Sequence, residues 1–362
     1  RSIAPPSRGC ALQGAPRRIW SEASQASIVA LGSCFVVAGY HTKDGGERVF
    51  VLHLPSEGLP EPIASVPIAP AHASPRLAPP GLAADKGQGV SLVYSDGERK
   101  LHLLSLQVGA TRGGGASREL AQGVDTRFAP AVAFGKHGPL VAFTLGTTPM
   151  RTQLARVDAQ GKIVDMHDIT PEAMGASAPA FVDGASPMTI VMADARNGMS
   201  PIARTLLDPD GRPAPAQVAA PVGMLSEPPE LAAAYGGSSA YVAYTGLGSA
   251  STSAVGLVQI TPKPGAPEAL VKGTAYGALH TAAVSLGNAI VVAADAPLGT
   301  GKSDKHELHV VRIDEVGKGP LLRITGPDGD ASRVSLAHNA EGELGVLFSS
   351  KDGVYLARAR CE

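Results

Sequence analysis

A repeat of about fifty residues runs through almost the whole chain and limits the folds that the chain can adopt. Seven short apolar runs, rich in Val, Ala, Leu and Ile, end near positions 39, 94, 143, 193, 244, 294 and 348. The intervals between these positions are 55, 49, 50, 51, 50 and 54 residues, so seven units account for all 362 residues. Such a period indicates a structural repeat in which each unit packs mainly against its neighbours.

Each unit shows the same order of expected strands and turns. In the fourth unit, a first strand at residues 180–182 precedes the apolar run at 189–193, and a third strand follows at 202–207. The turn Asp208-Pro209-Asp210-Gly211 closes this unit, and a weaker fourth strand is expected in others, as at residues 321–324. Turn residues at these intervals predict short strands joined by tight turns. Runs that are apolar at consecutive positions are typical of strands covered on both faces.

Four short strands per unit at this period resemble the blades of seven-bladed β-propellers, a resemblance of period and pattern that covers essentially the whole chain. No Trp-Asp dipeptide ends a strand, and Trp20 is the single tryptophan, so no specific propeller family is indicated. The resemblance implies an all-β fold and a single domain over residues 1–362, built from four-stranded antiparallel blades. A pair of β-sandwich domains is the alternative.

The two ends of the chain are expected to meet in the last blade. The seventh unit lacks a fourth strand, whereas residues 10–19 precede the first complete unit, so an N-terminal strand should complete blade seven. Cys10 and Cys361 would then lie at adjacent strand ends, and a disulfide between them is favoured. Pairing of Cys10 with Cys34, or three free thiols, are the alternatives. A disulfide would imply an oxidising compartment and therefore export.

Composition and charge exclude several classes of partner. The chain has 31 basic and 32 acidic residues, and no basic stripe, which argues against nucleic acid. No apolar run is long enough for a transmembrane segment. The start at Arg1 without a leader and the Ala-, Gly- and Pro-rich composition suggest a processed, exported bacterial protein that is periplasmic, anchored to the outer membrane or extracellular. A monomeric ring that binds another envelope or surface protein is expected.

No catalytic group, metal site or cofactor site is indicated by a motif. His306 and His309 are three residues apart in an expected strand, so their side chains should point to opposite faces. Asp-Gly pairs at 44–45, 96–97 and 352–353 are interpreted as type I′ hairpin turns, because one carboxylate per turn is too few for calcium. No Gly-x-Ser-x-Gly nucleophile elbow is present.

One face of the expected ring carries the candidate binding residues. In a propeller, the loops leading into the inner strands and the loops joining second to third strands share one face around the channel mouth. The polar residues in the former loops that we select as a binding rim are Arg76, Arg127, Glu227, His280 and Arg333. Arginines at such a rim could hold an anionic group. The longest second-to-third loops, at 145–153, 246–255 and 295–305, lie on the same face.

The favoured function is a non-enzymatic binding or scaffold propeller that engages a protein partner or ligand through this loop-rich face. The alternative is a propeller-type hydrolase or lyase with acid and base groups at the channel mouth. A lectin is less favoured, because sugars usually stack on aromatic side chains and aromatics make up only 4% of the chain.

Overall fold

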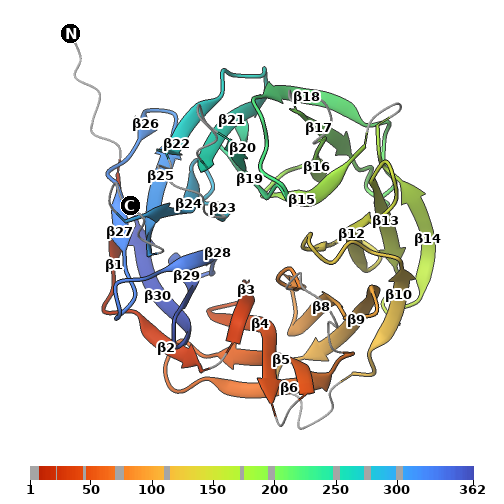
Figure 1. Ribbon diagram of the computed structural model, residues 1–362, viewed down its shortest axis with the longest axis horizontal. Coiled ribbons are helices and arrows are strands. Elements are labelled where there is room, and N and C mark those ends of the chain that lie inside the picture. Colours follow the sequence, from red (N-terminus) through yellow and green to blue (C-terminus); the bar gives the residue numbers. More distant parts are fainter. Residues whose placement is uncertain are drawn as a thin grey trace.

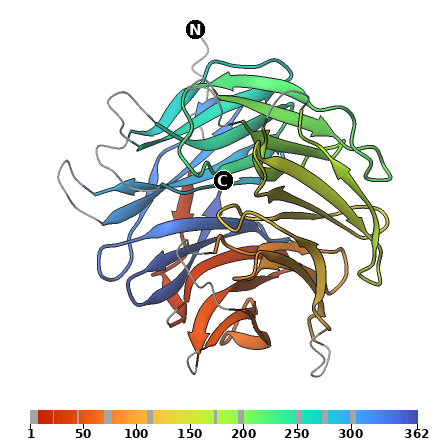
Figure 2. The same cartoon turned by 45° about the vertical axis from the view of Figure 1, so that its right-hand side comes forward.

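A computed structural model describes residues 8–21, 23–43, 46–69, 77–109, 115–171, 175–194, 200–247, 253–272, 279–298 and 305–362. All elements assigned in these ranges are strands, and they form a ring of seven blades that follow one another in chain order (Figure 1). The oblique view in Figure 2 shows the same succession of blades around the axis. The all-β, seven-bladed propeller predicted from the repeat is therefore confirmed.

Each blade runs from an inner strand at the axis to an outer strand at the rim. The inner strands are β3 Ala23–Leu31, β7 Gly81–Ala84, β11 Ala131–Phe134, β15 Ser177–Asp183, β19 Leu231–Gly236, β23 Thr281–Ser285 and β28 Ser332–His338. The second strands are β4 Cys34–Lys43, β8 Gly89–Ser95, β12 Pro139–Leu145, β16 Thr189–Ala193, β20 Ser239–Leu247, β24 Ile290–Pro297 and β29 Glu343–Ser350. Each second strand ends close to the position expected from the repeat.

The outer half of each blade is more irregular than the inner half. The third strands are β5 Gly46–Leu54, β9 Lys100–Gln107, β13 Arg151–Val157, β17 Ser200–Leu206, β21 Ser253–Thr261, β25 His306–Asp314 and β30 Gly353–Cys361. The first five outer strands are β6 Glu61–Pro67, β10 Arg118–Gln122, β14 Ile163–Asp168, β18 Gln217–Val222 and β22 Glu268–Lys272. In the last two blades the outer position is shared by two short strands, β26 Gly317–Lys318 with β27 Leu322–Ile324, and β1 Cys10–Leu12 with β2 Arg17–Trp20.

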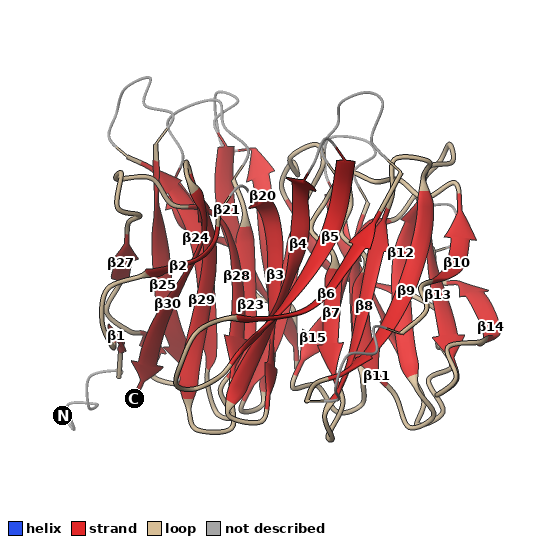
Figure 3. Cartoon of the chain, turned by 90° about the horizontal axis from the view of Figure 1, so that it is seen from below, coloured by secondary structure: helices blue, strands red, loops and turns tan. Residues whose placement is uncertain are grey.

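The N-terminal segment completes blade seven. Both β1 and β2 pair antiparallel with β30, with Cys10 opposite Cys361 and Arg17 opposite Leu356. The expected single strand is thus divided in two, because residues 13–16 leave the ladder between the two pairings. Cys10 and Cys361 form a disulfide, the pairing that the sequence favours, and Cys34 is free and half-buried. In side view, β1 and the C-terminus lie at the same edge of the ring (Figure 3).

The core consists of layers between neighbouring blades. Every residue of β8 and of β16 is buried, as expected for strands covered on both faces. Val36 in blade one and Leu92 in blade two belong to one such layer, and Phe35 and Leu347 to the layer between blades one and seven. Because each blade has two apolar faces, the ring buries both only when all seven blades are stacked.

Blades four and five are joined by an additional contact. The inner strands β15 and β19 pair in parallel, with Val182 opposite Ala233 and Asp183 opposite Ala234. Neighbouring inner strands of a propeller usually contact through side chains, and the small Ala side chains here let the backbones approach. The period of the repeat predicts no such pairing, so it is a finding of the structure.

The hairpin between β8 and β9 differs from the expected type I′ turn. Ser95 pairs with Leu101, and the turn is closed by a hydrogen bond from the Asp96 N–H to the Lys100 carbonyl. Arg99 occupies the left-handed region with φ 62°, and Gly97 has no positive φ, so the two-residue geometry is excluded. The Asp44-Gly45 pair lies outside the described residues.

Candidate functional site

A cavity of about 400 Å³ opens on the axis where the seven inner strands begin. Every blade contributes one segment to its wall: residues 25–27, 78–79, 127–129, 178–179, 228–232, 280–283 and 333–336. In a propeller, the inner strand of each blade starts at the face that also carries the second-to-third loops. The cavity therefore lies on the loop-rich face. We call it the channel mouth.

The structure brings three of the five selected rim residues to the channel mouth. Arg127, His280 and Arg333 line the cavity. Glu227 is not among the residues that line it. The pKa of Arg127 is raised mainly by its hydrogen bond to Asp125, and the Glu227 carboxylate adds a smaller contribution. Arg76 lies outside the described residues. The cationic side chains of blades three, six and seven therefore meet around one space.

His280 is held between two carboxylates, one directly before β19 and one in β24. Its Nδ1 lies 2.6 Å from Glu230 Oε1, and its backbone N–H donates to Asp295 Oδ1 at 2.5 Å. Burial by itself lowers the pKa of His280, but the charge and hydrogen bond of Glu230, with a further contribution from Asp295, raise it to about 9. The imidazole consequently carries a positive charge at neutral pH.

Asp295 connects blades six and seven beneath the cavity. The residue is fully buried, and its second carboxylate oxygen accepts the backbone N–H of Arg333 at 3.3 Å. Burial raises the pKa of this carboxyl. Asp295 thus fixes the backbone of both His280 and Arg333, and we regard it as a positioning residue.

A buried polar residue occupies the same place in every repeat, directly after the apolar run of the second strand. These residues are Tyr40, Ser95, Thr144, Asp194, Thr245, Asp295 and Ser349, and all are at most 8% exposed. Thr144 Oγ1 accepts the N–H of Ala178, and Thr245 Oγ1 accepts the N–H of Glu230. In blades three, five and six, this residue ties down the segment that leads into an inner strand.

Left-handed backbone conformations at non-glycine residues gather on this face. Among the described residues they occur at Arg99, Ala178 and Arg333, with φ of 62°, 51° and 56°. Ala178 and Arg333 line the channel mouth, and both follow an Ala-Ser pair at the start of an inner strand. Such conformations are unfavourable for residues with a Cβ and cluster at functional sites. The left-handed backbone at Arg333 orients its side chain at the cost of some local strain.

Arg127 is fixed by a salt bridge. Its Nε and Nη2 donate to Asp125 at 3.0 and 2.7 Å, and its guanidinium lies over the ring of Phe128, 5.5 Å from the centroid. Burial alone would raise the pKa of Asp125, but the hydrogen bonds from Arg127 outweigh it and lower the pKa. Arg127 therefore presents its remaining N–H groups from a rigid position.

A second cavity, of about 750 Å³, adjoins the channel mouth over blades two to four. Arg127 lines both cavities, and Ser177 of the second cavity directly precedes Ala178 of the first. Arg99, Asp125 and Asp194 also line it. We call this second cavity the groove.

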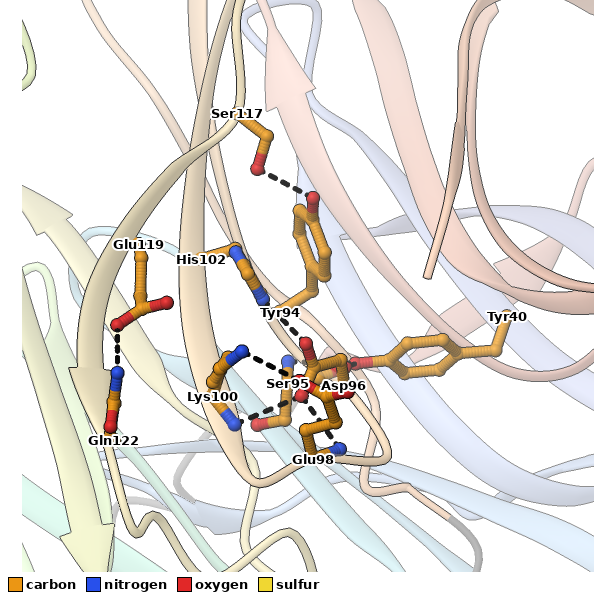
Figure 4. A network of polar contacts seen from close by, with 10 residues as sticks. All are labelled: Tyr40, Tyr94, Ser95, Asp96, Glu98, Lys100, His102, Ser117, Glu119 and Gln122. Carbon is orange, nitrogen blue, oxygen red and sulfur yellow. Dashed lines mark hydrogen bonds and ion pairs between the residues drawn. The ribbon is translucent and has the colours of Figure 1, made fainter. Parts of the chain in front are cut away.

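The groove is bordered by a hairpin that a polar network holds in place (Figure 4). Asp96 Oδ1 accepts the N–H groups of Glu98 and Lys100, and Asp96 Oδ2 lies 2.8 Å from His102 Nε2. The Tyr40 hydroxyl bonds the backbone of Ser95 across the blade boundary at 3.1 Å. These groups satisfy one another, so the network is structural, and its effect is to fix the turn that carries Arg99.

Several site residues were not among those selected from the sequence. Glu230 follows two prolines before an inner strand, and Asp295 is a lone acid at the end of an apolar run. An acid in such a run is a signal, since buried carboxylates require partners. Gln25 lies at the channel mouth and is 9% exposed. Arg99 gave no signal, because Gly normally takes its backbone conformation.

The described residues show no group of three or more His, Cys, Asp or Glu side chains that could hold a metal ion. They also contain no helix that is long and apolar enough to cross a membrane.

Comparison with known proteins identifies a shared fold only. No known family model matches the chain, and none of the curated proteins matches its sequence. The structure is similar to BP39L lectin from Burkholderia pseudomallei, at 15% identity and a TM-score of 0.65 over 94% of this chain and 97% of the lectin chain.

Two further solved structures are similar at lower TM-scores. A Mycobacterium tuberculosis puromycin-hydrolyzing peptidase is 15% identical with a TM-score of 0.55, and the match covers 98% of this chain and 54% of the peptidase. Polysaccharide lyase Uly1 is 11% identical with a TM-score of 0.53, and the match covers 92% of this chain and 89% of the lyase. Because a lectin, a peptidase and a lyase share this architecture, function has to be argued from the site.

Proposed function

We propose that this chain is a binding protein that holds an anionic group of its ligand, a carboxylate, at the channel mouth. The observation that carries this proposal is the convergence of Arg127, His280 and Arg333 on one cavity. Glu230 is the one acidic side chain among the described lining residues. Even when Asp125, the partner of Arg127, is counted with it, the three cationic side chains leave the described wall cationic on balance. Charge-assisted hydrogen bonds to a carboxylate are stronger than neutral ones.

The rest of the cavity suits an apolar part of the same ligand. Prolines and alanines from several blades form much of the wall, as at Pro79, Ala129, Pro179 and Pro228. Concave sites with apolar walls and a few convergent polar groups are the usual form of ligand pockets. The ligand is therefore expected to carry an aliphatic group beside its carboxylate.

The state of His280 favours binding over general base catalysis. A general base must be able to accept a proton near neutral pH, whereas this imidazole remains protonated to a pKa of about 9.

A second candidate function, a hydrolase or lyase, is supported by the contact between Glu230 and His280. Glu230 and His280 lie 2.6 Å apart in a cavity, which is the arrangement of an acid and its partner. Product release from a peptide or an acidic oligosaccharide that His280→Gln abolishes, with binding retained, would favour this second function.

Export to a bacterial envelope or surface is part of the proposal. The disulfide between Cys10 and Cys361 supports it, because such bonds persist in oxidising compartments. A protein partner in the same compartment would be a natural source of the ligand group.

The test uses N-acetyl derivatives of Gly, Ala, Leu and Phe, each as the free acid and as the amide, titrated into the full chain by calorimetry and ligand-observed NMR. We expect only the acids to bind, and Arg333→Met to weaken their binding at least about tenfold, the effect of losing one bond to a charged group.

Arg323→Met is the matched control, since Arg323 is 64% exposed and pairs with Glu307 on the outside of blade six. Equal binding of acids and amides, or equal losses in the two variants, would contradict the proposal.

A further inference from the structure

The channel mouth and the groove share a wall, so one ligand can occupy both. Arg127 borders both cavities, and the consecutive residues Ser177 and Ala178 border one each. With volumes of about 400 and 750 Å³, the two spaces together exceed the size of a small acid. This inference rests on the proposed function and concerns the rest of the ligand.

The groove differs from the channel mouth in its charge. Among the described residues, its charged lining consists of two arginines, Arg99 and Arg127, and two aspartates, Asp125 and Asp194. Hydroxyl groups of Thr126, Thr147 and Thr148 add neutral donors and acceptors. The groove is thus polar but balanced, whereas the channel mouth is cationic.

Arg99 is built into the groove at a conformational cost. Its turn follows the same pattern as those that begin at Asp158 and Asp208, where Oδ1 of the aspartate accepts two backbone N–H groups. In those two turns the left-handed position is taken by Gly161 and Gly211, with φ of 79° and 80°. Arg99 takes the equivalent position in the turn beside the groove. Non-glycine residues in this region occur where the surrounding structure maintains them, often at ligand sites.

The side chain of Arg99 is immobilised across a blade boundary. Its Nε donates to the Val124 carbonyl at 3.0 Å and its Nη2 to the Gly123 carbonyl at 3.2 Å. A Cβ at position 146 would lie 2.1 Å from Arg99 Nη2, so Gly146 leaves the space that this guanidinium needs. The arginine is therefore pre-organised along the groove.

We propose that the ligand is an extended polypeptide segment whose C-terminal carboxylate sits in the channel mouth and whose preceding residues lie in the groove. A peptide carries one anionic end followed by neutral amide groups, which matches a cationic pocket followed by a balanced polar groove. A polyanion such as an acidic glycan would need a net positive charge along its whole length. A neutral glycan would need an aromatic platform, and in the described part of the chain the one aromatic side chain lining the two cavities, Phe128, is 5% exposed.

The proposal is tested with a hexapeptide library, degenerate at every position, made once with free C-terminal carboxylates and once with C-terminal amides. The chain selects binders from each set, and the affinities of selected hexapeptides are compared with those of their own C-terminal dipeptides. The groove variant is Arg99→Gly, which keeps the turn because Gly is the residue of the matching turns. Lys136→Gly is the matched control, since Lys136 is a 66% exposed lysine in a turn on the opposite face.

We expect binders from the free-acid set alone, and hexapeptides that bind at least about tenfold more tightly than their dipeptides. Arg99→Gly should remove most of this gain without weakening the dipeptides, and Lys136→Gly should change neither affinity. Hexapeptides that bind no better than dipeptides would overturn the peptide groove and leave the carboxylate site standing. Absence of any preference for free acids would overturn both proposals. Binding of hexagalacturonate that depends on Arg99, without peptide binding, would show that the ligand class is wrong.

Discussion

His280 shows how one residue can combine a structural and a binding role. Its imidazole contacts Glu230, its backbone N–H contacts Asp295, and the charge of Arg333 opposes its protonation. The net effect is a pKa of about 9, raised from 6.5. A group that binds its proton more tightly when folded stabilises the fold while it is protonated in the folded state.

The stability of the protein should therefore fall as pH rises from about 6.5 to about 9. The contribution of His280 is complete below the unfolded pKa of 6.5 and is lost as pH passes the folded value, with a magnitude on the order of 3 kcal/mol. Urea unfolding at pH 6, 7.5 and 9 measures this slope. His280→Gln should flatten it, whereas His137→Gln, at a 59% exposed histidine on the opposite face, should not. An unchanged slope in His280→Gln would contradict the assignment.

At the scale of residues, the charged residues of the rim were easier to predict from the sequence than the acidic residues that contact them. Arg127, His280 and Arg333 could be selected because they stand in the loops that lead into inner strands. Glu230 could not be paired with His280, because the two are 50 residues apart and meet only through the stacking of neighbouring blades. The spacing of a repeat gives the position of a loop, and the rotamers within it follow from packing.

Among the elements, the second strands connect the core to the site. In each, the apolar run is followed directly by a buried polar residue on the side of the loop-rich face. In blade five this residue is Thr245, whose Oγ1 accepts the Glu230 N–H at 2.8 Å and lies 2.6 Å from Ser226 Oγ. The same strand thereby packs the blade and fixes the segment that leads into β19, the inner strand of its own blade.

Thr245→Val should reduce the free energy of unfolding by about 1–3 kcal/mol. Valine has nearly the same shape but leaves the Glu230 N–H and the Ser226 hydroxyl without this partner. Chemical denaturation of the variant measures the loss, and weaker binding of N-acetyl amino acids would show that Glu230 has moved. Thr42→Val, at an exposed position near the end of β4, is the control. A Thr245→Val protein as stable as the parent would show that these bonds contribute nothing.

The elements themselves were largely predictable, and the exceptions have physical causes. The period of the apolar runs located all seven second strands, because burial on both faces requires consecutive apolar residues. The division of the N-terminal segment into β1 and β2 was not predictable, since it depends on register against β30. The turn at Asp96 was misassigned as type I′, because the pair Asp-Gly concealed a longer turn with Arg99 in the left-handed position.

On the scale of the whole molecule, the ring is closed by a disulfide and by strand pairing in blade seven, and a further strand pairing joins blades four and five. The bond from Cys10 to Cys361 and the pairing of β1 and β2 with β30 unite the two ends of the chain. The parallel pairing of β15 with β19 joins blades four and five by backbone hydrogen bonds. Ring closure could be predicted from the missing fourth strand of the last unit, whereas the parallel pairing arises from the close approach of small residues.

Replacing both bridged cysteines by serine should lower the free energy of unfolding by about 2–5 kcal/mol, because the bridge restricts the unfolded chain over a separation of 351 residues. Urea unfolding of Cys10→Ser/Cys361→Ser measures the effect, with and without reductant. Cys34→Ser is the control, as this cysteine is free. A double variant with the stability of the oxidised parent would show that the strand pairing alone maintains the seam.

The same bridge determines how the molecule carries force. Because the bonded cysteines lie 351 residues apart in the chain, tension applied at its two ends passes through the sulfur–sulfur bond and bypasses every blade. In an oxidised molecule held in an optical trap, we therefore expect the blades to stay folded under load. After reduction, the load falls on β1, β2 and β30, and the seam of blade seven separates before the other six blades unravel.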